Sequence, residues 1–112
     1  MAMFGRHLQK LRKARGRSLR KVARGIEKTP GYLSRIERGE VPPPSDEVII
    51  ALAEQLGEDP DVLLVMAGRA PEGLLEIIRE NPFEFARLIR RLKGAPGKVV
   101  EQVARKVKDG NW

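Results

Sequence analysis

The chain has 112 residues, 41% of them hydrophobic, and a formal net charge of +7, which suits one compact domain with an appended segment. It contains no cysteine, which excludes a disulfide framework and a thiolate metal site. No apolar run approaches a membrane span and the basic N-terminus lacks the apolar core of a signal peptide, so we expect a soluble, cytoplasmic protein.

Glycine, proline and capping residues predict helices along the whole chain, and no stretch alternates as a strand does. The first five helices are expected at about 5–15, 18–25, 29–38, 45–56 and 59–67. Their expected N-caps, after a first helix that begins near Gly5, are Ser18, Thr29, Ser45 and Asp59. Five short helices joined by short links predict a small all-α domain.

Residues 69–112 predict a C-terminal helical extension with helices near 70–81 and 81–93, a break at 94–97, and a final helix. Asn81 is the expected cap of the second of these, with Glu84 at its third position. Two apolar stripes at helical spacing are predicted to form a dimer interface: Phe85, Leu88, Ile89 and Leu92, then Val100, Val103 and Val107. The alternative for the first stripe is packing on the five-helix core, and residues 71–92 are expected to do some of each. The stripe after residues 94–97 is the better candidate for contact between protomers, because the link before it is flexible.

The charge is sorted along the chain. Residues 1–39 hold twelve lysines and arginines against two acids, whereas residues 40–68 hold seven acids and no lysine or arginine. Residues 69–112 are basic again, with ten basic and six acidic side chains. An ordinary solvated surface mixes the two signs. The sorting therefore predicts one face suited to a polyanion and another that repels it.

The helices at 18–25 and 29–38, with a tight turn between them, have the layout of a helix-turn-helix, in which the second helix enters the major groove and the first lies across the backbone. Arg20 and Lys21 fall in the first turn of the earlier helix, where cations oppose the helix dipole. Lys13, Arg15 and Arg17 crowd the same region. This density favours contact with phosphates over ordinary surface charge.

The stretch "RSLRKVARGIEKTPGYLSRIERGEVPPPSDEVIIALAEQLG" resembles the helix-turn-helix domain of the lambda repressor and Cro superfamily, and "YLSRIERG" is its most specific part. The resemblance covers roughly residues 5–67. It implies an all-α, five-helix lambda repressor-like domain over residues 1–68, extended by helices over 69–112. It also implies a regulator that binds double-stranded DNA.

The resemblance, together with the basic residues above, assigns roles by position. Base contacts are expected from Gly31, Tyr32, Ser34 and Arg35. Contacts to the DNA backbone are expected from Arg17, Ser18, Arg20, Lys21, Lys28, Thr29 and Arg38. Arg12 and Glu37 match a structural ion pair of the family, which argues against Arg12 as a DNA contact. For Tyr32 the alternative is an aromatic that supports the helix, and for Arg35 a surface salt bridge.

Three positions depart from the family. Leu19 replaces a glutamine that helps to clamp DNA, so Arg17 or Arg20 would have to supply that contact. Glu27 replaces the glycine of the turn, at a cost of roughly 1 kcal/mol if it adopts left-handed angles. Pro30 and Gly31 replace polar side chains that contact bases. The proline is tolerated at the first helical position, and the glycine lets the protein backbone approach DNA closely.

A helix with so few readers cannot supply specificity alone, which predicts a homodimer on an inverted repeat. A repressor is the expected function. The alternatives are an antitoxin whose extension also binds a toxin, and a protein-interaction module that no longer reads DNA. His7 is the only histidine, and no phosphate-binding loop or metal-ligand spacing is present, so neither an enzyme nor a cofactor is expected.

Overall fold

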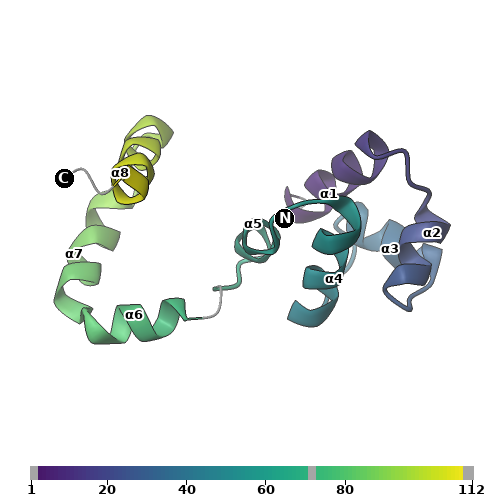
Figure 1. Cartoon of the computed structure of the whole chain (residues 1–112), viewed down its shortest axis with the longest axis horizontal. Coiled ribbons are helices and arrows are strands. Elements are labelled where there is room, and N and C mark those ends of the chain that lie inside the picture. Colours follow the sequence, from purple (N-terminus) through teal and green to yellow (C-terminus); the bar gives the residue numbers. More distant parts are fainter. Residues whose placement is uncertain (1–2, 71–72, 110–112) are drawn as a thin grey trace. The chain divides into compact units, whose positions relative to one another are not determined.

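The computed structural model describes residues 3–70 and 73–109, with side chains up to residue 105. Within these residues the chain is all-α, with eight helices and no strand (Figure 1). The backbone divides into two compact units, an N-terminal unit that ends at residue 71 and a C-terminal unit that begins at residue 72. No helix of the described residues is long and apolar enough to cross a membrane.

The N-terminal unit contains α1 (Met3–Ala14), α2 (Leu19–Gly25), α3 (Pro30–Glu37), α4 (Asp46–Leu56) and α5 (Pro60–Met66). Its four predicted N-caps are confirmed, because each capping side chain accepts a backbone N–H of the first helical turn. At the end of α4, Gly57 takes the left-handed conformation, with φ of 68°. The caps and short links fix five helices within fewer than seventy residues.

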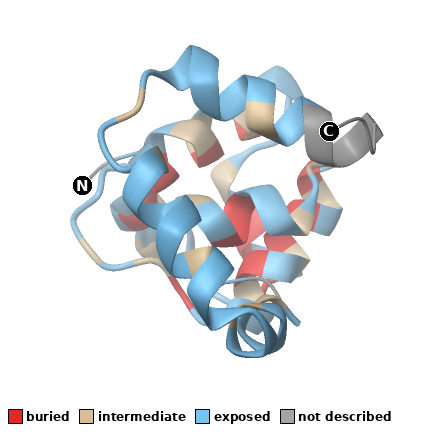
Figure 2. Ribbon diagram, turned by 90° about the vertical axis from the view of Figure 1, so that its left-hand side faces the viewer, coloured by how far each residue is buried: buried red, intermediate tan, exposed pale blue. Residues whose placement is uncertain are grey.

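The core of this unit draws apolar side chains from all five helices, and Figure 2 shows the buried residues where the helices face one another. Eight large side chains are fully buried, each contributing about 1.5–3 kcal/mol by leaving water. They are Leu8, Val22, Leu33, Ile36, Ile49, Leu52, Leu56 and Leu63. Ala23 is also fully buried, at the crossing of α2 with its neighbours.

The first helix begins at Met3, two residues before the predicted start at Gly5. The two additional residues include Phe4, which is buried in the core. Gly5 is then the point where α1 crosses α3: a Cβ at this position would lie 2.2 Å from the carbonyl oxygen of Ile36 and 2.7 Å from that of Glu37. The glycine is therefore required by a close approach of backbones rather than by a helix start.

The C-terminal unit contains α6 (Leu74–Glu80), α7 (Pro82–Leu92) and α8 (Gly97–Asp109). Asn81 lies at the predicted N-cap position of α7, and its carbonyl accepts the N–H of Phe85 at 3.0 Å. Its side chain, however, makes no capping hydrogen bond to α7, and its φ of −131° and ψ of 56° differ from the extended angles of the other caps. Its Nδ2 donates instead to the carbonyl of Ile77 at 3.0 Å, because α6 ends directly before α7 begins and its last carbonyls need donors.

Candidate nucleic-acid interface

The entry to α2 is built by Ser18, whose Oγ accepts the N–H of Lys21 at 3.1 Å. The first turn of α2 contains no acidic residue, and the side chains of Arg20 and Lys21 are exposed. Arg17, directly before the cap, is exposed as well. This end of α2 therefore offers free cations and backbone N–H groups together, which is the combination that attracts a phosphate.

Leu19 is half-buried and packs against the core. The position at which the family carries glutamine is therefore an apolar packing position here. The side chain that anchors α2 is thus not available to hydrogen-bond DNA. The exposed arginines at 17 and 20 are the groups that remain for that contact.

The turn between α2 and α3 is closed by backbone hydrogen bonds and holds one strained residue. The N–H of Lys28 donates to the carbonyl of Ala23 at 2.9 Å, and that of Glu27 to Arg24 at 3.1 Å. Glu27 has a φ of 57°, and no other non-glycine residue among those described has a positive φ. A side chain in this conformation costs about 1–2 kcal/mol, which the packing of α2 and α3 must offset.

Helix α3 is capped by Thr29, whose Oγ1 accepts the N–H of Tyr32 at 3.1 Å, and Pro30 is at the first helical position. Leu33 and Ile36 anchor its inner side in the core. Gly31 and Arg35 are exposed on the outside. A Cβ at Gly31 would meet nothing within 4 Å, so no neighbour in the chain requires glycine there.

Tyr32 and Ser34 are half-buried, between the two sides of α3. The ring of Tyr32 packs against the core, and the Nζ of Lys28 lies 5.9 Å from the ring centroid, within the range of a cation–π contact. The tyrosine therefore supports α3 and orients Lys28 at the exposed edge of the turn. Its contact with a base remains a prediction.

Arg35 and Arg38 differ in their surroundings. None of the ion pairs found among the described residues involves Arg35. Arg38, after the end of α3, makes an exposed ion pair with Glu40, with Nε 2.9 Å from Oε2. An exposed pair of this kind is worth about 0–1 kcal/mol and is screened by salt, so it would exchange readily for a phosphate contact.

Arg12 and Glu37 lie inside the unit and form a two-point ion pair between α1 and α3. Arg12 is 8% exposed, so its charge is not available to DNA. The hydrogen bond to Glu37 raises the pKa of Arg12 above its ordinary value. With Glu37 buried in this pair, Glu27 is the one acid of residues 1–39 that is exposed.

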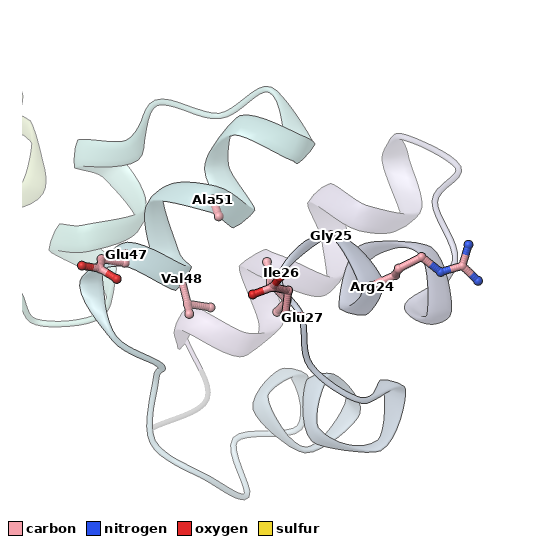
Figure 3. Close-up of a pocket in the computed structure, with 7 residues that line it drawn as sticks. All are labelled: Arg24, Gly25, Ile26, Glu27, Glu47, Val48 and Ala51. Atoms are coloured by element: carbon pink, nitrogen blue, oxygen red, sulfur yellow. The ribbon is translucent and has the colours of Figure 1, made fainter.

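An open pocket of about 320 Å³ lies beside the turn, on the side of α4 (Figure 3). Its lining includes the carboxylates of Glu27 and Glu47, and Figure 3 shows the side chain of Arg24 extended away from both. Val48 and Ala51 of α4 complete the wall. Two carboxylates on one wall disfavour a phosphate there, so this pocket borders the basic surface of α2 and α3 on the side of the acidic segment 40–68.

Three further contacts between distant residues hold this unit together. His7 Nε2 donates to Glu58 Oε2 at 3.0 Å, and Gln55 Nε2 donates to the carbonyl of Val22 at 3.3 Å. Arg69 pairs with Asp46. All three join residues at least 23 positions apart, and no local pattern identifies such partners. In the described residues, no group of three or more histidine, acidic or cysteine side chains could hold a metal.

Fold and site together define a DNA-binding domain of the helix-turn-helix class. A family model described as a helix-turn-helix domain matches residues 3–64, more than half of the chain. The chain belongs to this family, and the resemblance to the lambda repressor and Cro regulators is confirmed.

Among solved structures, the chain is similar to the clp gene regulator ClgR from C. glutamicum. The two are 31% identical, the match covers 60% of this chain and 86% of that one, and the TM-score is 0.51. No curated protein was found to match the chain.

Proposed function

We propose that this protein is a transcriptional regulator that binds an inverted-repeat operator as a homodimer and represses by occupying it. The observation that carries the proposal is the exposure of Gly31 and Arg35 on α3 beside the exposed cations of α2 and its flanks. A helix with a buried inner side and an unobstructed outer side fits the major groove. Likeness to a solved regulator, ClgR, supports a role in gene control.

In this proposal, the residues around the start of α2 and those on α3 have different roles in DNA binding. Arg17, Arg20 and Lys21 contact phosphates and set the position of the domain on the duplex, while Arg35 reads a base edge. Guanine, with two acceptors in the major groove, is the base that an arginine grips best. Arg38 exchanges Glu40 for a phosphate on binding.

In this proposal, sequence specificity requires two copies of the domain on one operator. One α3 supplies too few readers for an operator, whereas two copies about one helical turn apart double the reading. The second copy is held by the C-terminal unit, where no described side chain is buried and large apolar side chains are exposed on all three helices. Val100 and Val103 of α8 are among these partly or fully exposed apolar side chains, whereas the side chain of Val107 lies outside the described residues.

Selection of bound fragments from random duplex DNA tests the proposal. The expected result is an enriched inverted repeat with half-site centres about 10 bp apart, bound with an affinity that falls steeply as salt rises. A sequence-independent, weak interaction with little salt dependence would refute DNA reading and leave an interaction module. Enrichment of a single half-site would refute the symmetric dimer alone.

A further inference from the structure

Helix α7 has an apolar stripe with no buried member. Phe85, Leu88, Ile89 and Leu92 follow helical spacing on one side of the helix, and Leu88 and Ile89 are 37% and 55% exposed. A helix this strongly amphipathic is stable in water when another surface covers its apolar side. The charges that border the stripe identify that surface.

One edge of the stripe has an acid and two bases, Glu84, Arg87 and Arg91. Glu84 and Arg91 are seven residues apart, which is two helical turns, so they lie on the same side of α7 at a separation of roughly 10 Å along its axis. An open hollow of about 310 Å³ lies at this edge, lined by Glu84, Arg87, Leu88 and Arg91. None of the ion pairs among the described residues includes Glu84 or Arg91.

This arrangement of charges is complementary to itself in one orientation. When two helices pack antiparallel about a twofold axis, each edge of one stripe meets the same edge of the other. Glu84 then faces the partner's Arg91, and Arg91 faces the partner's Glu84. When two helices pack in parallel, the charged edge meets the opposite edge, where Ala86 and Ile89 carry no charge and Lys93, directly after α7, has the same sign as Arg91.

We propose that α7 is the dimer interface, packed antiparallel against α7 of a second copy with the twofold axis passing near Leu88. This inference rests on the proposed function in that it names the contact of the proposed dimer. Two symmetric ion pairs between Glu84 and the partner's Arg91 flank the apolar contact. The aliphatic stem of each arginine lies over Leu88 in the hollow of the other copy, and its guanidinium reaches Glu84.

Charge reversal in the full-length chain tests this geometry. Arg91→Glu places two acids opposite each other at both ends of the interface, and Glu84→Arg places two bases there. Each change removes two ion pairs and introduces two repulsions, so the dimer dissociation constant measured by sedimentation should rise at least about tenfold. The double variant E84R/R91E restores both attractions and should recover dimerisation to within about threefold.

A mixture of the two single variants provides a second readout. The Arg91→Glu chain has acids at both positions and the Glu84→Arg chain has bases at both, so the mixture should form a heterodimer while each variant alone stays largely monomeric. The matched control is Arg90→Glu, which makes the same charge change on the side of α7 away from the stripe and should leave dimerisation unchanged. Circular dichroism of each variant verifies that α7 has not unfolded.

Wild-type affinity in both single variants, a double variant that stays dissociated, or a wild-type chain that is monomeric would each overturn the proposal. The last result would mean that the rest of the chain covers the stripe. These outcomes are independent of the DNA selection. An inverted repeat with a dimer insensitive to charge reversal refutes the α7 interface alone, and charge-sensitive dimers that do not bind DNA refute the proposed function alone.

Discussion

Arg12 on α1 and Glu37 on α3 are joined by two hydrogen bonds, from Nε to Oε2 at 2.6 Å and from Nη2 to Oε1 at 3.0 Å. The third arm of the guanidinium, Nη1, donates to the carbonyl of Arg17 at 2.9 Å. One buried side chain therefore ties the end of α3 to α1 and to the loop that leads into α2. The two helices proposed to meet DNA are positioned by this shared contact.

Removing one partner of this pair should destabilise the N-terminal unit strongly. Glu37→Ala leaves a buried guanidinium without its counter-ion, and the expected loss in the free energy of unfolding is about 3–5 kcal/mol, measured by urea denaturation. The double variant R12M/E37L, with apolar side chains of similar size, should regain most of that loss. Arg38→Ala, which breaks an exposed pair, is the control and should change stability by less than about 1 kcal/mol.

Arg35→Ala and Arg38→Ala should affect DNA binding in different ways. Loss of Arg35 should reduce discrimination among bases at one position of each half-site by about 1–3 kcal/mol, whereas loss of Arg38 should weaken all sequences alike and lower the salt slope. Competition binding on a panel of single-base operator variants distinguishes the two. An unchanged base preference in Arg35→Ala would show that Arg35 does not contact a base. Glu40→Gln, which releases Arg38, should tighten binding at low salt.

Two glycines in helices should respond in opposite directions to alanine. Gly5→Ala places a Cβ against the carbonyl oxygens of Ile36 and Glu37, which are backbone atoms of α3, and should destabilise the fold by about 1–3 kcal/mol. Gly31→Ala has open space and should stabilise α3 by about 0.5 kcal/mol. If the outer side of α3 reads DNA, only Gly31→Ala should change operator preference at unchanged or higher thermal stability. No change in preference would argue against close approach at Gly31.

Glu27→Gly should stabilise the protein by about 1 kcal/mol, because glycine adopts the φ of 57° without strain. The control is Glu27→Ala, which removes the same charge but keeps a Cβ and should give no such gain. Thermal unfolding of the two variants gives the comparison. Equal stabilities would show that the carboxylate rather than the backbone angle controls stability at this turn.

Acid should weaken the contact between α1 and the link before α5. The Glu58 carboxylate accepts hydrogen bonds from His7 and from the N–H of Asp59, both at 3.0 Å, and these lower its pKa below the ordinary 4.5. A group whose pKa is lower in the folded state stabilises that state above its unfolded pKa, and this contribution is lost as pH falls through the folded pKa. Unfolding free energy measured from pH 5 downward should therefore fall less steeply in Glu58→Gln. Glu54→Gln, on the exposed side of α4, is the control and should leave the slope unchanged.

The sequence alone determined the helices of the N-terminal unit and the class of protein. Ser18, Thr29, Ser45 and Asp59 act through backbone groups within three residues, so local sequence is enough to place the helix starts. Local sequence was a poorer guide in the C-terminal unit. Asn81 lies at the junction of α6 and α7, and its side chain donates to a carbonyl of α6 rather than capping α7.

Tertiary structure decided what depends on residues far apart in the chain. The need for glycine at position 5 comes from the α1–α3 crossing, and the partner of His7 lies 51 residues away, so no local pattern encodes either. Tyr32 shows the same limit within the candidate site. Its spacing on α3 is readable from the sequence, but its half-burial against the core and its contact with Lys28 exist only once α3 is packed. Close approach and burial are properties of pairs of surfaces, and only folding brings those surfaces together.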